Sequence, residues 1–258
     1  MTDLFELRGG VAIVSGASGW LGPTMVRALD SMGAQVIGVS RRREPLEIAL
    51  LGTSARAETA DVSTRSWPDL IDRVGREFGR IDVLINNAHI GRGGSLATVT
   101  ADLFDEAWQL SVVGAWRGIQ AARPWMKVAG ASGGSPSVIN IASMYGMVGP
   151  DLSLYAAEEG RTPPMYGAAK AGLIQLTRYA AAELGPERIR VNSITPGPFP
   201  AEAAQGDPDF IERLEARTML GRVGSPEELA TAVLFLASRN SGFVTGSNVV
   251  VDGGWTVR

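Results

Sequence analysis

The sequence predicts an α/β protein in which parallel strands form one open, doubly wound sheet with helices on both faces. Two observations predict this architecture: short apolar runs rich in β-branched residues alternate with longer amphipathic stretches, and a glycine-rich turn follows the first apolar run. Alternating strands and helices favour parallel pairing through right-handed crossovers. The 258 residues contain no internal repeat and no low-complexity linker, which predicts a single domain over residues 1–258.

Short apolar runs bounded by glycine, proline or polar residues are typical of buried parallel strands. The expected strands are Val11–Val14, Gln35–Val39, Arg56–Ala60, Ile81–Ile85, Ser137–Ile141, Ile189–Ile194 and Asn248–Val251. The third is the least apolar of these runs. Parallel strands bring their carboxyl ends to one edge of the sheet, where ligands bind in such folds.

The amphipathic stretches predict the helices that cover the sheet. These are a helix through Met25–Leu29 that stops at Gly33, a helix over Ser66–Phe78, one long helix over Ala101–Val128, a helix from near Tyr166 to near Gly185, and a helix that begins at Pro226 with Ser225 as its N-cap. Proline and acidic residues suit the first turn of the last of these helices.

Composition excludes several classes of chemistry. The chain has no cysteine and one histidine, so disulfides, thiol catalysis, a Ser-His-Asp triad and a histidine-rich metal site lack material, and no metal is expected. The net charge of -3, without a broad basic face, argues against nucleic acid. No signal peptide and no apolar run of ~18 residues is visible. A soluble, cytoplasmic protein that binds a small molecule, not a membrane, is expected.

The turn after the first strand has the pattern of a dinucleotide site. Its glycines let the backbone approach a pyrophosphate, and the following helix offers free N–H groups and the positive end of its dipole. A glycine-rich turn alone is weak evidence, but its place after the first strand is specific. The expected cofactor contacts here are Gly16, Ser18, Gly19, Trp20, Leu21 and Gly22.

The end of the second strand indicates which dinucleotide is bound. An acidic residue about 20 positions after the glycines would bind the ribose 2′-hydroxyl of NAD. The chain instead has Ser40-Arg41-Arg42-Arg43 and no acid before Glu44. A hydroxyl and guanidinium groups suit the 2′-phosphate of NADP. NADP is therefore expected, with NAD possible and a solvated charge run as the alternative.

At this point the sequence resembles the short-chain dehydrogenase/reductase family, in its single-domain branch with a Rossmann-type fold, over nearly its whole length. The motifs that carry the resemblance are the glycine turn at 15–22, Asp61-Val62, Asn86-Asn87-Ala88, Ser143, Tyr166-Gly-Ala-Ala-Lys170, Asn192-Ser-Ile-Thr-Pro196-Gly197 and the closing stretch from Val244 to Gly254. Several spaced motifs together are far more specific than any one of them.

The resemblance implies a role for each matched position. Asp61 and Val62 would hold the adenine ring, and Asn87 and Ala88 would line the adenosine ribose. Pro196 and Gly197 would lie beside the nicotinamide, and Ser143, Tyr166 and Lys170 would be catalytic, Lys170 also binding the nicotinamide ribose. Similar relatives are commonly homotetramers assembled through the two long helices and the C-terminal strand.

The residues support the catalytic roles independently. Tyr166 and Lys170 are spaced i, i+4 and share one helix face. A phenol has a reference pKa of ~10, which the nearby ammonium and a cationic oxidised nicotinamide would lower. Tyr166 would then exchange a proton with the carbonyl or alcohol oxygen, and Ser143 would hydrogen-bond that oxygen. Tyr155 is the competing tyrosine, but Glu159 at its i+4 position would raise its pKa.

Three single residues depart from the family pattern. Trp20 stands where glycine is usual, and either narrows the phosphate cleft or points away from it. Ser111 stands where an asparagine usually completes a proton relay. That relay also uses a main-chain carbonyl that holds a water, so Ser111, a candidate catalytic residue, weakens the case for proton delivery without abolishing activity. His89 also replaces a usual glycine, and is expected to be a loop residue packing near the cofactor.

Two segments are expected to shape the substrate site. Residues 149–164 form an insertion between Ser143 and Tyr166 that would cover the mouth of the site as a lid rich in polar side chains. Residues 198–224 would close over substrate. Tyr145, Tyr155 and Phe199 are the substrate-site candidates, although Phe199 would serve equally well as a loop anchor.

These features predict an oxidoreductase that transfers hydride between NADP(H) and a carbonyl or secondary alcohol. The polar insertion favours a hydroxylated substrate, and relatives with a similar Ser-Met-Tyr-Gly run include sugar-acid dehydrogenases. Two alternatives remain: a cofactor-binding sensor or scaffold that has lost catalysis, motivated by Ser111 and Trp20, and an epimerase-type enzyme, motivated by the glycine spacing.

Overall fold

A computed structural model describes residues 4–257. Its described residues form a seven-stranded sheet in the order β3-β2-β1-β4-β5-β6-β7, and every neighbouring pair is parallel. The strands are β1 Val11–Ser15, β2 Gln35–Ser40, β3 Arg56–Thr59, β4 Val83–Asn86, β5 Ser137–Ile141, β6 Arg190–Pro196 and β7 Asn248–Val251. The predicted fold class is confirmed, and the strand order reverses between β1 and β4, where open α/β sheets bind ligands.

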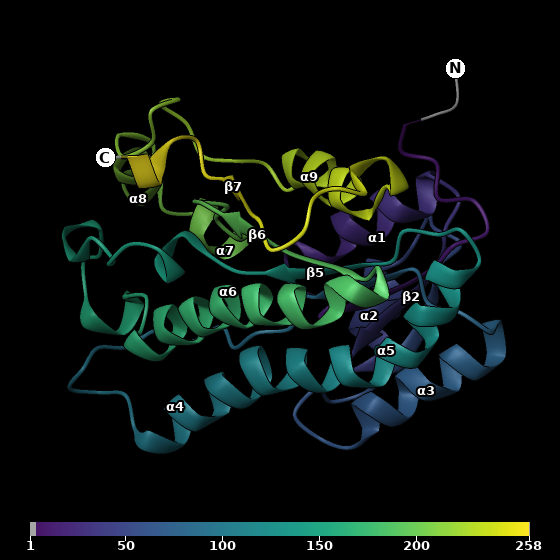
Figure 1. The fold of residues 1–258 in the computed structure, drawn as a ribbon. Coiled ribbons are helices and arrows are strands. Elements are labelled where there is room, and N and C mark those ends of the chain that lie inside the picture. Colours follow the sequence, from purple (N-terminus) through teal and green to yellow (C-terminus); the bar gives the residue numbers. More distant parts are fainter. Residues whose placement is uncertain (1–3, 258) are drawn as a thin grey trace.

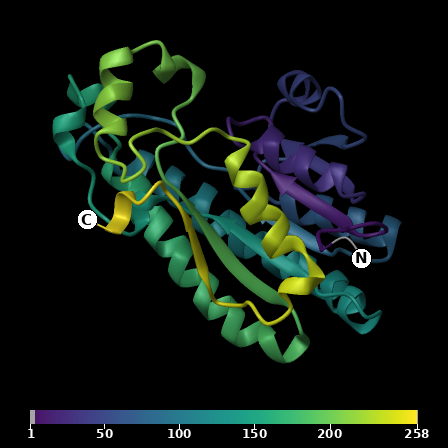
Figure 2. The ribbon, with the colours of Figure 1, turned by 90° about the horizontal axis from the view of Figure 1, so that it is seen from above.

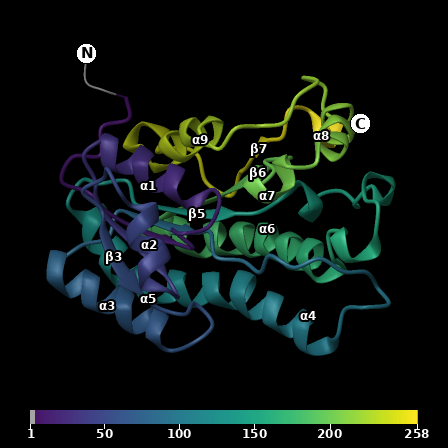
Figure 3. The same ribbon diagram turned by 180° about the vertical axis from the view of Figure 1, so that it is seen from behind.

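Helices cover both faces of the sheet, as Figures 1 and 3 show from opposite sides. Helices α1 Gly22–Ser31 and α9 Glu228–Ala237 pack together on one face. Helices α3 Ser66–Phe78, α5 Gly114–Ala131 and α6 Pro164–Leu184 lie on the other face.

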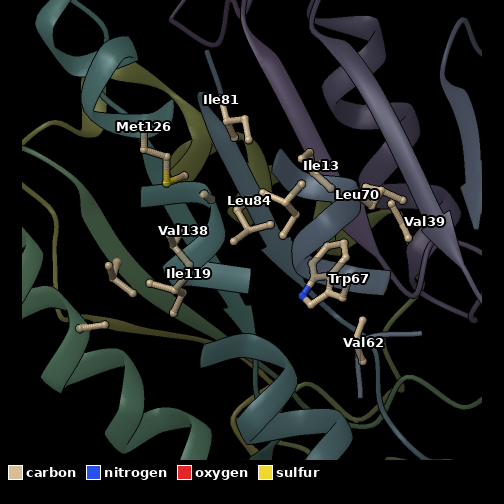
Figure 4. Packing of buried hydrophobic residues seen from close by; sticks show 14 of the residues in the cluster. Ile13, Val39, Val62, Trp67, Leu70, Ile81, Leu84, Ile119, Met126 and Val138 are labelled. Atoms are coloured by element: carbon tan, nitrogen blue, oxygen red, sulfur yellow. The ribbon is translucent and has the colours of Figure 1, made fainter. Parts of the chain in front are cut away.

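Alternation along β1 explains why both faces are covered. Its four first residues are buried, with Val11 and Ile13 in one apolar cluster and Ala12 and Val14 in another. Successive side chains of a strand point to opposite faces, so a strand that is apolar throughout needs a helical layer on each side. Figure 4 shows the cluster around Trp67, which fills the space between the sheet and its covering helices.

The stretch predicted as one long helix over 101–128 is interrupted. Helix α4 covers Ala101–Trp108, a π-helical turn covers Gln109–Val113, and α5 continues from there with Pro124 inside it. π-helical turns occur as short insertions inside α-helices, and the amphipathic pattern of this stretch did not mark the insertion.

The start of α9 also corrects a prediction. The helix begins at Glu228 instead of Pro226, and Ser225 does not cap it with its side chain. The Glu228 carboxylate instead accepts the main-chain N–H of Ser225 at 3.0 Å and binds the Arg222 guanidinium, while a turn over residues 225–227 leads into the helix.

Three short helices were not predicted. Helix α2 covers Arg43–Ala49, and α7 Glu202–Gln205 and α8 Pro208–Glu215 lie within the segment expected to be a mobile loop. In α2 only Leu46 is buried, so it lacks a broad apolar stripe. Asp207 caps α8 by accepting the Phe210 N–H at 3.0 Å.

Candidate active site

A cavity of about 440 Å³ lies at the carboxyl edge of the sheet, beyond the ends of β1, β2, β4, β5 and β6. Most of the predicted site residues line it: Gly16, Ser18, Gly19, Trp20, Leu21, Ser40, Arg41, Arg42, Val62, Asn87, Ala88, Ser143, Tyr166, Lys170, Pro196, Gly197 and Phe199. Five predicted residues lie outside its lining: Gly22, Asp61, Ser111, Tyr145 and Tyr155.

The glycine turn requires its glycines for close backbone contact. Gly16 has a positive φ of 66°, and a Cβ there would lie 2.9 Å from the backbone of Ala88. A Cβ on Gly22 would lie 2.4 Å from the Gly16 carbonyl oxygen, so Gly22 permits the turn to pack although it does not line the cavity. No side chain caps the start of α1, but the Gly22 N–H donates to the Gly19 carbonyl at 3.0 Å, and Pro23 has no N–H. The groups open to an anion are therefore the N–H groups of Trp20 and Leu21 just before the helix, for which no described residue is a partner.

The basic residues after β2 divide into paired and unpaired groups. Arg43 binds an acid one turn along α2 at 2.8 Å. Arg41 and Arg42 line the cavity and form no ion pair with any residue that the structure describes. Ser40 and Ser18 connect this segment to the glycine turn through hydroxyl groups 2.5 Å apart. The two free guanidinium groups and the hydroxyls fit a phosphate ester.

Asp61, which was expected to hold the adenine ring, does not line the cavity. Its carboxylate accepts hydrogen bonds from the main chain and the hydroxyl of Ser63, at 2.9 and 2.6 Å, and so fixes the turn after β3. Its neighbours Ala60 and Val62 present the apolar wall of the cavity instead.

Tyr166, Lys170 and Ser143 meet at the inner end of the cavity. Tyr166 and Lys170 lie in successive turns of α6, with the Lys170 Nζ atom 5.7 Å from the centre of the Tyr166 ring. Lys170 is 2% exposed and donates a hydrogen bond of 2.7 Å to the carbonyl oxygen of Ile141, at the end of β5. The Ser143 side chain lies close enough to the Tyr166 hydroxyl to act on its pKa, and its oxygen accepts the N–H of Tyr145 at 3.2 Å.

The electrostatics of this group differ from the sequence-based expectation. Burial raises the pKa of Tyr166, and the neighbouring Ser143 side chain opposes that shift only in part. Burial also lowers the pKa of Lys170 to about 7. Burial therefore disfavours the ammonium form of Lys170, and the predicted lowering of the pKa of Tyr166 by that ammonium is not among the effects that act on Tyr166 in this structure.

His89 lies in the loop after β4, as predicted, and its ring contacts the Tyr166 ring. It lines the cavity, and its ring centre is 6.0 Å from that of Tyr166 in an edge-on contact. Burial lowers the pKa of His89 to about 4, and the charge of Lys170 adds to the shift. The only signal in the sequence was a histidine where related chains carry glycine.

Ser111 lies in the π-helical turn, buried, beside the cavity-lining Leu110. The apolar residues Ile141 and Ala142 also line the cavity and were not predicted. They are main-chain neighbours of Ser143 at the end of β5, a position that the strand pattern alone does not mark as part of a site.

Tyr145 and Tyr155 form a chain of hydroxyl groups behind the cavity lining. The two phenolic oxygens are 3.2 Å apart, and that of Tyr155 is 2.7 Å from the hydroxyl of Thr162. Burial raises the pKa of Tyr145, and the neighbouring hydroxyls of Tyr155 and Tyr166 act in the same direction. Tyr145 is therefore a neutral hydrogen-bonding group.

The insertion at 149–164 is attached on both sides. On one side Arg213 of α8 donates to the carbonyl of Leu154 at 2.9 Å, and Arg217 pairs with Asp151. On the other side the N–H of Gly94 donates to the carbonyl of Arg161 at 3.1 Å. The insertion thus bridges α8 and the loop after β4.

Phe199 both lines the cavity and anchors the 198–224 segment, the two roles predicted for it. It lines the cavity, and its ring lies so close to Gly224 that a Cβ there would approach within 2.6 Å. The N–H of Gly224 also donates to the carbonyl of Pro198 at 3.0 Å, which closes the base of the 198–224 segment.

The described residues contain neither a membrane-spanning helix nor a metal-binding group of acidic, histidine or cysteine side chains. None of the helices within 4–257 is both long and apolar enough to cross a membrane. No group of three or more acidic, histidine or cysteine side chains in this range could hold a metal ion.

Comparison with known proteins agrees with the geometry. A family model described as Enoyl-(Acyl carrier protein) reductase matches residues 16–256. The chain is 34% identical to gluconate 5-dehydrogenase of Gluconobacter oxydans, over 99% of this chain and 98% of that protein. It is 31% identical to 7alpha-hydroxysteroid dehydrogenase of Bacteroides fragilis, over 96% and 94%.

A solved structure, the Pseudomonas aeruginosa RhlG/NADP active-site complex, superimposes with a TM-score of 0.89 at 30% identity, over 99% of this chain and 100% of that one. The relatives act on a sugar acid and on a steroid at nearly equal identity, so substrate choice has to be argued from the site.

Proposed function

Because the chain belongs to the short-chain dehydrogenase/reductase family, we propose that it is an NADP(H)-preferring oxidoreductase that acts on a carbonyl or secondary alcohol of a polar, hydroxylated small molecule such as a sugar acid or polyol. The observation that carries this proposal is Lys170: a buried amine with one hydrogen bond, one helical turn from a tyrosine that Ser143 engages. The whole chain acts as one domain.

The residues present fit a nicotinamide dinucleotide. The uncapped start of α1 suits the pyrophosphate, and the unpaired Arg41 and Arg42 suit a 2′-phosphate, which favours NADP over NAD. Lys170 keeps two N–H donors that no described residue uses, which suits the ribose hydroxyls. The bound nicotinamide would supply or accept the hydride.

The chain's own residues handle the proton. Tyr166 donates its phenolic proton to the substrate oxygen in reduction and accepts it in oxidation. Ser143 donates a hydrogen bond to the same oxygen and stabilises its developing negative charge. A hydroxyl-bearing ligand beside Lys170 brings oxygen atoms to its amine, which favours the ammonium and thereby the phenolate of Tyr166.

The insertion supports a hydroxylated substrate. Residues 149–164 are secured on two sides and place the linked hydroxyls of Tyr155 and Thr162 near Tyr145. The similarity to gluconate 5-dehydrogenase is consistent with such a substrate. We propose that 149–164 forms a polar wall over the site, and that 198–224, with Phe199 at its base, closes against it.

Assembly as a homotetramer is part of this proposal. Several large apolar side chains on α4, α5 and α6 are substantially exposed in the single chain: Phe104, Trp108, Trp116 and Tyr179. Val250 of β7 is also exposed, at 38%. Exposed apolar groups of this kind are covered in assemblies. We place the protein in the cytoplasm on the grounds of its composition.

The test is absorbance of the reduced nicotinamide during turnover of a panel of sugar acids, polyols and ketones, with NADP and NAD in parallel. Tyr166→Phe should lower kcat by about 10²- to 10⁴-fold while leaving cofactor affinity intact. Cofactor binding without turnover of any compound would favour a sensor, and isomerised product without net redox change would favour an epimerase-type enzyme.

A further inference from the structure

His89 is the single histidine of the chain, and its side chain forms part of the wall around the reacting centre. It follows β4 directly after the dinucleotide motif, and its ring meets the edge of the Tyr166 ring at an interplanar angle of 65°. It is also close enough to Lys170 for the charge of that residue to disfavour a protonated imidazole.

The surroundings fix which nitrogen of His89 is free. Nδ1 lies 3.4 Å from the carbonyl oxygen of Asn87. A carbonyl accepts and cannot donate, so this contact requires the proton on Nδ1 and leaves the lone pair on Nε2. No described residue donates a hydrogen bond to Nε2. The His89 side chain is exposed to the cavity and its pKa is lowered, so the ring is neutral and Nε2 is an acceptor open to a ligand near Tyr166.

The other polar groups at this end of the cavity mainly donate. Tyr166, Ser143 and Lys170 present O–H and N–H groups that suit a carbonyl or alkoxide oxygen. No carboxylate belongs to the described lining of the cavity. The hydroxyl oxygens of Ser143 and Tyr166 can also accept, but the proposed mechanism directs them to the reacting oxygen, which leaves His89 as an acceptor for a ligand hydroxyl next to the reacting carbon.

We propose that Nε2 of His89 accepts a hydrogen bond from a hydroxyl group of the bound ligand beside the reacting centre. This inference rests on the proposed dehydrogenase function and sharpens it. Two sources offer that chemistry: a substrate hydroxyl next to the reacting carbon, and a hydroxyl of the nicotinamide ribose. A ligand without the hydroxyl leaves the acceptor unpaired and is discriminated against, by about 10-fold for one neutral hydrogen bond.

Two variants separate acceptor chemistry from packing. His89→Phe keeps a ring against Tyr166 but has no acceptor, and His89→Gln keeps an acceptor on a shorter, unringed side chain. In the cofactor arm, NADPH and NADH are titrated by their fluorescence without substrate. In the substrate arm, kcat/KM is measured for an α-hydroxy ketone and for the same ketone without the hydroxyl. Melting temperatures verify that both variants fold.

A ribose contact predicts about 10-fold weaker binding of both reduced cofactors in His89→Phe, with most of the affinity retained in His89→Gln. A substrate contact predicts unchanged cofactor binding and a hydroxy-to-deoxy preference that falls about 10-fold in His89→Phe and less in His89→Gln. If the two variants behave alike in every arm that the wild-type enzyme supports, the inference is overturned. Absence of turnover in the wild type overturns the proposed function instead, and the titration then decides the inference alone.

Discussion

Two buried cations at opposite edges of the sheet show how structural and functional charges differ. Arg190 lies at the amino end of β6 and is 4% exposed, and Lys170 lies near the carboxyl end of β5 and is 2% exposed. Neither forms an ion pair with a described acid. Arg190 is nevertheless surrounded by oxygen acceptors. Its guanidinium donates to the hydroxyls of Ser135 and Ser241 and to the carbonyls of Ser135 and Ser238.

Lys170 has one such acceptor, the carbonyl of Ile141. Burial lowers the pKa of Arg190 to about 10 and that of Lys170 to about 7. The arginine therefore stays charged at neutral pH, and its charge is solvated by the protein. The lysine carries unused donors at the edge where ligands bind. A buried cation with too few partners is thus the mark of the site.

Lys170→Met should produce the largest effect. Activity should fall by about 10²- to 10⁴-fold, because the ammonium that favours the Tyr166 phenolate is gone. At pH 6 the cofactor-free variant should melt at the same or a higher temperature than the wild type, because a costly buried charge is removed. Steady-state rates and thermal melts measure both. A melting temperature well below wild type would show that the lysine is structural, and the comparison would fail.

Arg190→Met should have the opposite effect to Lys170→Met, because it should lower stability and leave activity almost unchanged. It leaves buried serine carbonyl and hydroxyl oxygens without donors, so the free energy of unfolding should fall by about 2–4 kcal/mol. The kcat of the folded fraction should stay within about twofold, since the residue lies at the far edge. Urea unfolding and active-site titration measure these quantities. Arg190→Lys is the matched control and should recover part of the stability.

The pH dependence of stability should separate the same two residues. The folded pKa of Lys170 is lowered from 10.5 to about 7, so between these values the unfolded chain binds the additional proton. The contribution of Lys170 to stability therefore rises with pH across this window. In urea titrations, the free energy of unfolding of the wild type minus that of Lys170→Met should increase by about 2 kcal/mol from pH 7 to pH 9. A constant difference would contradict the lowered pKa.

Arg41→Ala should give the smallest effect and extends the comparison to exposed cations. Arg41 is unpaired and lines the cavity, whereas Arg43 already has an acidic partner. Affinity for NADP should fall about 10-fold, and affinity for NAD should not change, because only NADP carries the 2′-phosphate. Arg43→Ala is the control and should change neither. Fluorescence titration with both reduced cofactors measures the ratio.

Sequence patterns predicted those parts of the structure that depend on residues close together in the chain. Strand β5 occurs at its predicted residues, since five consecutive buried positions admit little else. The i, i+4 spacing of Tyr166 and Lys170 already fixed their common helix face. The glycine turn was equally readable, because Gly16 needs a positive φ.

Features that depend on distant partners were not readable. The attachment of the insertion to Arg213 and Gly94 joins segments more than fifty residues apart. The pKa of Tyr166 depends on how deeply it is buried, which spacing does not reveal. His89 lies in the loop after β4, as predicted, but its contact with Tyr166 of α6 depends on tertiary packing that its place in the sequence does not reveal.

The first and last described segments of the chain lie at different edges of the molecule, as Figure 2 shows from above. The carbonyl of Leu4 accepts the Asn240 amide at 2.9 Å, near the edge that holds Arg190. At the other end, Trp255 packs with Leu154 of the insertion and Leu214 of α8. An affinity tag or surface tether joined at the carboxyl end would therefore start beside the entrance for substrate. Immobilised or sensor formats should be anchored through the amino end.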